Sequence, residues 1–166
     1  MRMITLHGQK AAGRVALVDD EDYDLVMQYR WFVWEKKRRD GRIDGPYAVG
    51  QVPGTRSGLI LMHKLITEWP LTDHEDHDGL NNQRSNLRPA TTSQNGGNLL
   101  PQQGRSSRFK GVTWHKKVRK WQAAITVRGQ YKYLGCFTSE EDAARAYDEA
   151  AIAGFGSFAH LNLGPQ

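Results

Sequence analysis

The chain has 166 residues, of which 39% are hydrophobic, enough for one ordinary domain or two small ones with a real core. It has no apolar stretch of the roughly 18 residues that a membrane span needs, and its start, MRMITLHGQK, lacks the apolar run of a secretory signal. The single cysteine, Cys136, excludes an intramolecular disulfide and a cysteine-based zinc site. We therefore expect a cytoplasmic protein with no membrane contact.

The net positive charge lies in the second part of the chain. Residues 1–104 carry 13 Lys or Arg and 13 Asp or Glu, so residues 105–166, with 10 and 5, account for the whole formal charge of +5. Residues 105–139 hold nine of these cations and no acid. Such a run is either a solvated basic face or a surface for a polyanion such as nucleic acid.

The first part of the chain reads as β-rich. Alternating or apolar runs predict strands at residues 14–20, 30–36 and 46–52. Asp19 can cap a short helix in residues 20–29, and residues 38–45 form a turn-rich hairpin loop. Residues 59–69 fit a strand that turns into a short helix before Pro70. We expect three tryptophans to lie in this core or to cover it: Trp31, Trp34 and Trp69.

The second part follows a linker at residues 99–108, which is rich in Pro, Gly, Gln and Ser. Three strand-like runs come next, at residues 109–117, 120–129 and 131–137. Residues 139–156 form an alanine-rich helix that Thr138 or Ser139 caps and Gly154 and Gly156 end. Its apolar stripe consists of small side chains, so the helix can lie close against one face of a three-stranded sheet.

The outward face of this predicted sheet lacks bulky aliphatic side chains. Alternation along the second strand points Trp121, Ala123, Ile125 and Val127 inward, and sends Gln122, Ala124, Thr126 and Arg128 outward. By the same parity Val112 and Trp114 point inward, whereas Thr113 and His115 point outward. The outward face is therefore a polar surface among basic residues.

Residues 109–163 resemble the Apetala-two, or ethylene-response-factor, DNA-binding domain. The shared pattern includes GV, KWQAAI, LGCF and AARAYDEAA. The resemblance implies that the sheet enters the major groove of double-stranded DNA. It implies base-facing contacts from Thr113, His115, Ala124, Thr126, Tyr131 and Tyr133, and phosphate contacts from Lys110, Lys117, Arg119 and Arg128. Thr113, His115 and Tyr131 stand where the plant pattern has arginine, so sequence preference is expected to be weak or different.

Acidic residues, imidazoles and amides are concentrated in residues 73–95, DHEDHDGLNNQRSNLRPATTSQN. Asparagine is a poor helix and strand former, so this abundance indicates turns or chemistry. A His can take a proton from water near neutral pH, and carboxylate and amide oxygens are hard ligands that suit magnesium. Most of these amides, Asn81 and Asn82 among them, are expected to hydrogen-bond to the backbone of turns. The Ser85 hydroxyl is expected to do the same.

This stretch resembles the HNH, or ββα-metal, nuclease motif, over about residues 63–98. The resemblance implies that Asp73 and Asn95 hold one Mg²⁺, with Mn²⁺ or another divalent cation as the alternative. It implies that His74 is the general base and that Asn86 fixes the loop and orients the imidazole. His63 also matches the family, either as a packed structural residue behind the site or as a DNA contact.

Two registers of the motif compete. With Asp73 and His74 as the pair, Asn86 lies twelve residues after the His and Asn95 lies twenty-two after the Asp, which is the usual spacing of the family. With Asp76 and His77 as the pair both distances shorten by three, so we favour His74 and expect His77 in a turn. A zinc site of Asp73, His74 and His77 is the weaker alternative, because no further Cys or His lies near them.

The combined expectation is an α+β protein in which an N-terminal β-rich region carries the ββα-metal HNH motif and a C-terminal three-stranded antiparallel sheet packs on one α-helix. The expected domains are a nuclease domain at 1–98, with a leader at 1–60 and the motif at 61–98, the linker at 99–108 and the DNA-binding domain at 109–163.

This combination resembles phage and intron-encoded HNH homing endonucleases, which implies a bacterial or phage-infected cell and no organic cofactor. Double-strand cutting would need a homodimer or two successive nicks. The rivals are a non-catalytic DNA-binding regulator with an inactive HNH scaffold and an RNA-directed or structure-specific nuclease.

Overall fold

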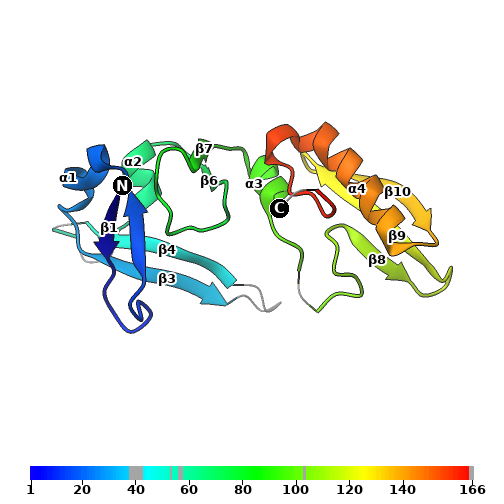
Figure 1. Ribbon diagram of the computed structural model, residues 1–166, viewed down its shortest axis with the longest axis horizontal. Coiled ribbons are helices and arrows are strands. Elements are labelled where there is room, and N and C mark those ends of the chain that lie inside the picture. The colour runs from blue at the N-terminus through cyan, green and yellow to red at the C-terminus, as the bar shows by residue number, and fades with distance from the viewer. Residues whose placement is uncertain (38–42, 53, 56–57, 103, 165–166) are drawn as a thin grey trace. The chain divides into compact units, whose positions relative to one another are not determined.

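The computed structural model describes residues 1–37, 43–52, 54–55, 58–102 and 104–164, and they form a mixed α+β protein, as the sequence predicts (Figure 1). The chain folds as two compact units, Met1–Ala90 and Thr91–Gln166. This division falls before the helix at residues 92–98, whereas the sequence suggested a boundary after it. None of the helices in the described ranges is long and apolar enough to cross a membrane.

The first unit is built from two hairpins and a three-stranded sheet. Its elements in chain order are β1 (Arg2–Thr5), β2 (Val15–Val18), η1 (Asp20–Asp22), α1 (Tyr23–Val26), β3 (Trp31–Lys37), β4 (Ile43–Gln51), β5 (Leu59–Leu61), α2 (Met62–Thr67), β6 (Thr72–His74) and β7 (Leu87–Pro89). β1 pairs with β2, β6 pairs with β7, and the larger sheet has the order β3-β4-β5, all antiparallel.

One apolar core holds these elements together. Trp31 is 1% exposed and its indole Nε1 donates to the Val26 carbonyl at 2.7 Å, so the aromatic ring is buried and its polar group is satisfied. Met62 and Ile66 of α2 and Leu87 of β7 belong to the same core. This packing places α2 beside the β6–β7 hairpin and so brings the HNH-like residues of the first unit onto one scaffold.

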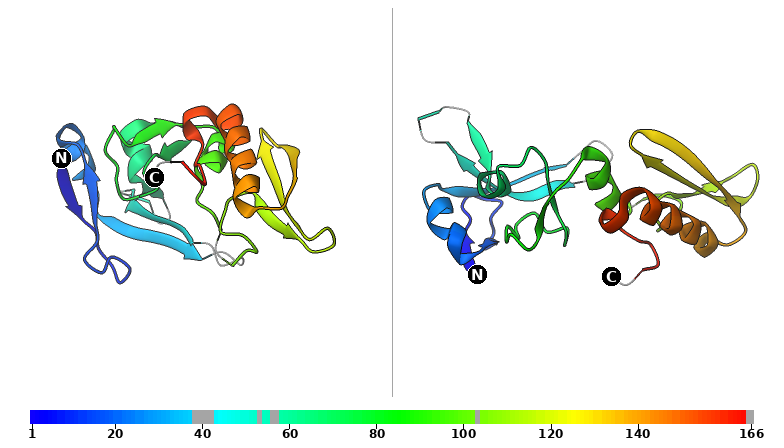
Figure 2. Two further views of the ribbon diagram at one scale, coloured as in Figure 1. Left: turned by 45° about the vertical axis from the view of Figure 1, so that its right-hand side comes forward. Right: turned by 90° about the horizontal axis from the view of Figure 1, so that it is seen from above.

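The second unit is a three-stranded sheet with one long helix along it, as the two further views show (Figure 2). Its elements are α3 (Thr92–Asn98), β8 (Val112–His115), β9 (Lys120–Val127), β10 (Gln130–Phe137), α4 (Glu140–Phe155) and η2 (Gly156–Phe158). The strand order is β10-β9-β8, all antiparallel. Buried alanines of α4, Ala143, Ala144 and Ala151, allow the helix to approach the sheet closely.

Both helices of the second unit begin with side-chain caps. Ser139 Oγ accepts the backbone N–H of Asp142 at 3.2 Å, acidic residues fill the first turn of α4, and Gly156, with φ +58°, ends it. Thr91 and Gln94 form a reciprocal capping box at the start of α3. The predicted start at Ser139 and end at Gly156 are confirmed, whereas Gly154, which was also expected to end the helix, lies inside α4.

Candidate active site

His74 lies at the end of β6 within a cluster of aromatic rings. It is 7% exposed, and its ring centroid is 5.0 Å from that of His63 on α2 and 5.9 Å from that of Tyr47 on β4. The ring centroids of Tyr47 and His63 are 5.7 Å apart. Because β6 ends here, the chain turns directly after the imidazole, and His77 N–H donates to the His74 carbonyl at 3.2 Å.

The surroundings of both imidazoles favour the neutral form. Burial lowers the pKa of His74, and a hydrogen-bonding interaction with Asn82 and the charges of Asp76, Asp73 and Asp78 oppose this shift. Burial also lowers the pKa of His63, to about 3, with the nearby His74 adding to the effect. A neutral imidazole is the form that accepts a proton, so the environment of His74 suits a general base.

Asp73 precedes His74 and faces Arg88 directly across the hairpin. The Asp73 Oδ2 accepts from Arg88 Nε at 2.9 Å and lies 2.9 Å from Arg88 Nη2. Arg88 Nη1 also lies 3.3 Å from Glu75 Oε1. Sequence reasoning missed Arg88, although its place opposite Asp73 follows once Asn86–Leu87 is taken as the start of the second strand.

The loop between β6 and β7 is held by short polar side chains. Asn86 Oδ1 accepts the backbone N–H of Asp76 at 2.9 Å, and its Nδ2 donates to the Asn81 carbonyl at 2.8 Å. Asp76 accepts from the Asp78 backbone N–H at 2.8 Å and from Asn81 Nδ2 at 2.7 Å. Asn86 therefore spans the loop, which is one half of its predicted role, and Asn82 is the asparagine that interacts with His74.

His77 has a different setting from His74. It is exposed and takes φ +67°, a left-handed backbone conformation that suits a tight turn. No group of three or more His, Cys, Asp or Glu side chains that could hold a metal occurs among the described residues, which include Asp73, His74 and His77. The zinc alternative therefore has no support in the structure.

Asn95 belongs to the second unit, on α3. Its Oδ1 is buried and makes no hydrogen bond within the described part of the chain. A buried amide oxygen without a partner is costly, about 1–3 kcal/mol, unless a bound group supplies the missing interaction. The carboxylate of Asp73 and the amide oxygen of Asn95 are both hard donors, so their chemistry fits Mg²⁺.

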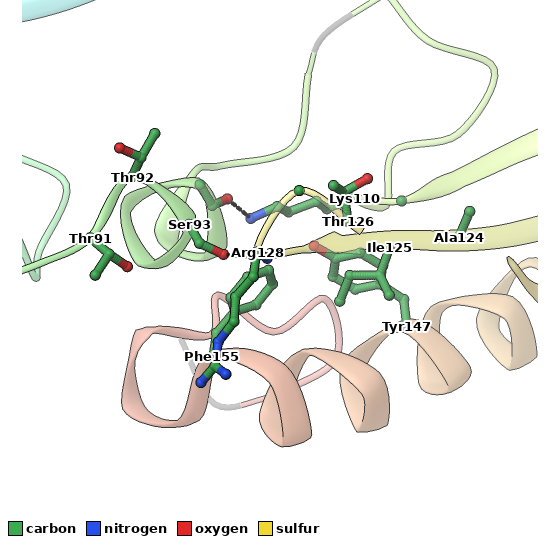
Figure 3. Close-up of a pocket in the computed structure, with 13 residues that line it drawn as sticks. Thr91, Thr92, Ser93, Lys110, Ala124, Ile125, Thr126, Arg128, Tyr147 and Phe155 are labelled. Carbon is green, nitrogen blue, oxygen red and sulfur yellow. Dashed lines mark hydrogen bonds between the residues drawn. The ribbon is translucent and has the colours of Figure 1, made fainter. Parts of the chain in front are cut away.

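Contacts with the sheet and with α4 hold α3 within the second unit. Lys110 Nζ donates to the carbonyls of Gly96 and Gly97 at 2.9 and 2.6 Å, and Figure 3 shows this side chain extended towards α3. Arg128 N–H donates to Ser93 Oγ at 2.8 Å. Burial lowers the pKa of Lys110 to about 8. Lys110 was expected on a DNA phosphate, whereas here its ammonium group binds the last turn of a helix.

The other predicted DNA contacts lie mainly on the open face of the sheet. Tyr131 and Tyr133 are 65% and 55% exposed. The remaining exposed residues of the predicted set are Thr113, Lys117, Arg119, Thr126 and Arg128. His115 and Ala124 are half-buried, and His115 Nδ1 accepts the Val118 backbone N–H at 3.3 Å. This face is polar and basic, as the alternation predicts.

Comparison with known proteins finds relatives of both units. An uncharacterized HNH endonuclease, L560, of Acanthamoeba polyphaga mimivirus is 30% identical over 162 residues, which cover 92% of this chain and 77% of that protein. APETALA2-like protein 2 of Oryza sativa subsp. indica is 42% identical over 59 residues, 36% of this chain and 14% of that protein. The AP2-like ethylene-responsive transcription factor PLT2 of Arabidopsis thaliana is 51% identical over 49 residues, 28% of this chain and 9% of that protein.

No family model and no solved structure matches the chain. The plant proteins share only a short segment with it, whereas the viral relative aligns with nearly the whole chain. The chain belongs to the family of HNH endonucleases.

Proposed function

We propose that this protein is a metal-dependent DNA endonuclease of the homing type, whose second unit binds duplex DNA and whose HNH-like residues hydrolyse a phosphodiester bond. The proposal includes one divalent cation, Mg²⁺ or Mn²⁺, between Asp73 and Asn95, and action in the cytoplasm of a bacterial or phage-infected cell. The observation that supports it most is the buried, neutral His74 directly after the Asp73 carboxylate.

His74 would take the proton from the attacking water, because its surroundings keep the ring neutral near pH 7. Asp73 and Asn95 would hold the cation, and Arg88 would keep the Asp73 carboxylate in place. The bound cation would supply charge stabilisation to the pentavalent phosphate and the departing 3′-oxygen. The products would carry 5′-phosphate and 3′-hydroxyl ends.

A second unit with its own basic face would raise the local concentration of DNA at this site. The plant relatives match only about a third of this chain. The resemblance to the plant domain implies that Thr113, His115 and Tyr131 stand in place of arginines, the side chains that read guanine. We therefore propose that Lys117, Arg119 and Arg128 contribute affinity, and that sequence preference is weak.

Nicking of supercoiled plasmid tests the proposal. Wild-type protein with Mg²⁺ should convert supercoiled DNA to the open circle, and His74→Ala should abolish this while retarding the same duplex in a gel. His77→Ala is the matched control, because His77 is an exposed turn residue, and it should nick as the wild type does. Duplex, branched and single-stranded substrates compared side by side would identify a structure-specific nuclease.

The second candidate is a DNA-binding regulator with an inactive HNH scaffold. One observation favours it, since Arg88 already neutralises the Asp73 carboxylate at 2.9 Å. If wild-type protein retards DNA but never nicks it with Mg²⁺, Mn²⁺, Co²⁺ or Ni²⁺, this candidate replaces the nuclease.

A further inference from the structure

The helix that carries Asn95 is too weak to keep its shape alone. α3 has seven residues, Thr92–Asn98, and they include the adjacent glycines Gly96 and Gly97. Isolated helices shorter than about 12 residues are marginal in water, and glycine is among the poorest helix formers. The helix also ends without a left-handed glycine cap, because Leu99 follows it in an extended conformation. Its stability must therefore come from contacts with the rest of the second unit.

Lys110 binds the end of α3 that lacks the glycine cap (Figure 3). Its Nζ donates to the carbonyls of Gly96 and Gly97 at 2.9 and 2.6 Å. These carbonyls belong to the last turn, in which no backbone N–H of the helix itself is available to them. A cation at this place also opposes the negative end of the helix dipole. Two of the three ammonium donors of Lys110 therefore go to α3.

The backbone of Lys110 is in turn fixed by contacts that lead to α4. Its N–H donates to Asn162 Oδ1 at 2.7 Å, and its carbonyl accepts from Asn162 Nδ2 at 3.1 Å. The carboxylate of Asp148, a buried residue of α4, accepts the backbone N–H groups of Asn162 and Leu163 at 2.8 and 2.9 Å. Hydrogen bonds to an ionised carboxylate are among the strong ones. A continuous chain of hydrogen bonds thus runs from α4 through Lys110 to α3.

This setting differs from that of a lysine that binds DNA. A lysine that neutralises a phosphate releases a counterion, and its ammonium group is free to move to the DNA. The Lys110 side chain is half-buried, and moving its ammonium group to a phosphate would break both bonds to α3. Lys117, by contrast, is exposed on the turn after β8. The two lysines, both expected on phosphates, therefore have different roles.

We propose that Lys110 is a positioning residue for the nuclease reaction, which holds the last turn of α3, and thereby Asn95, and makes no contact with a DNA phosphate. This inference rests on the proposed function in assigning the Asn95 amide oxygen to a cation. The fold of the second unit then supports a helix of the HNH-like motif, so it contributes to cleavage as well as to DNA affinity.

The first test uses the salt dependence of DNA binding. Lys110→Met keeps most of the aliphatic stem and removes the ammonium group. It should leave the slope of log affinity against log salt unchanged, whereas Lys117→Met should reduce that slope by about one. Fluorescence anisotropy with duplex DNA at several salt concentrations gives both slopes. An equal reduction in the two variants would place Lys110 on a phosphate and overturn the proposal.

The second test does not depend on cleavage. Amide hydrogen exchange in α3 should be about tenfold faster or more in Lys110→Met, because hydrogen bonds from a charged group are lost. Exchange in α4, which reports unfolding of the whole unit, should not change. Arg145→Met is the matched control, since it removes an exposed cation of the same unit, and exchange in α3 should stay at the wild-type rate.

The outcomes of the exchange test separate this inference from the proposed function. Unchanged exchange in α3 of Lys110→Met, or an equal increase in α4, would overturn the proposal whatever the activity. If the wild type never nicks DNA but Lys110→Met loosens α3 alone, the proposed function fails while the support of α3 by Lys110 stands.

The third test asks whether the effect reaches the cation. Lys110→Met should need about tenfold more Mn²⁺ for half-maximal single-turnover nicking at saturating DNA, with a rate at saturating Mn²⁺ within about twofold of the wild type. Gly96→Ala added to Lys110→Met should recover part of the lost Mn²⁺ affinity, because alanine strengthens the helix and a Cβ at Gly96 meets nothing within 4 Å. A wild-type Mn²⁺ requirement in Lys110→Met, or a defect that Gly96→Ala does not reduce, would contradict the positioning role.

Discussion

Asp73 and Arg88 face one another across the β6–β7 hairpin, with Arg88 Nε 2.9 Å from Asp73 Oδ2. The Arg88 side chain is only 16% exposed and that of Asp73 only 9%. Breaking one partner of such a pair leaves an uncompensated charge away from water, so the pair is expected to matter both for stability and for the orientation of the carboxylate.

Replacing Arg88 should therefore destabilise the first unit. We expect Arg88→Met to lower the free energy of unfolding by about 3 kcal/mol, the lower end of the cost of breaking a buried pair. Urea denaturation followed by tryptophan fluorescence measures it. Arg2→Met breaks an exposed pair with Asp20 and should cost less than about 1 kcal/mol. Similar losses of unfolding free energy in both variants would show that the Asp73–Arg88 pair stabilises the first unit no more than an exposed pair does.

Acid should weaken the first unit through His63. Its pKa in the folded protein is about 3, below the ordinary 6.5, so the unfolded chain binds the extra proton first as the pH falls. Stability is fully present above pH 6.5 and is lost towards pH 3, by at most about 1.4 kcal/mol per pH unit for this group. His63→Leu should flatten the decline between pH 6.5 and 4 and leave the slope above pH 7 unchanged. An equally steep decline in the variant would exclude His63 as the cause.

Two neighbouring glycines of α3 offer a matched pair of substitutions. A Cβ on Gly97 would lie 2.6 Å from the Phe155 ring of α4, whereas a Cβ on Gly96 meets nothing within 4 Å. Gly97→Ala should lower the stability of the second unit by about 1–3 kcal/mol through overpacking. Gly96→Ala should be neutral or stabilise it by up to about 1 kcal/mol.

Because α3 carries Asn95, Gly97→Ala should also slow nicking. Thermal unfolding and nicking rates of the two variants, measured together, check this. Normal cleavage by a Gly97→Ala protein with a displaced α3 would argue against a role for Asn95.

Salt dependence should report which face of the second unit meets DNA. Lys117→Gln on the turn after β8 should reduce the slope of log affinity against log salt by about one. Arg145→Gln removes the same charge from α4, where Arg145 pairs with Asp142 at 3.1 Å, and should leave the slope unchanged. Fluorescence anisotropy at several salt concentrations gives both slopes. A larger change in the α4 variant would place DNA on the helix side.

Local signals in the sequence were sufficient for several elements. Ser139, the acids after it and Gly156 set the ends of α4, and alternation along residues 121–127 gave the buried face of β9. The prediction that Trp114 points inward is only partly confirmed. Its ring packs at 5.0 Å on Trp121, yet it is 38% exposed, because β8 is a short edge strand.

Contacts between distant parts of the chain decided what the sequence could not predict. Asn82 and Asn86 are both amides in one loop, and only the backbone contact of Leu17 with Asn82, which no local pattern predicts, distinguishes their settings. The capping box of α3 was readable in principle from Thr91 and Gln94. The place of α3 in the second unit depends on contacts with Lys110 and Phe155. These residues are distant in sequence, so no local pattern predicts the contacts.

The proposed cation is the most direct test of the account, because the proposal assigns both the Asp73 carboxylate and the Asn95 amide oxygen to it. Mn²⁺ can be titrated into the complex of His74→Ala protein with duplex DNA, which should leave the DNA uncut, and followed by electron paramagnetic resonance. We predict one tight site per chain, lost when either Asp73→Ala or Asn95→Ala is added and retained when Thr92→Ala, an exposed neighbour on α3, is added instead. Tight binding that survives both the Asp73 and the Asn95 substitutions would contradict the account.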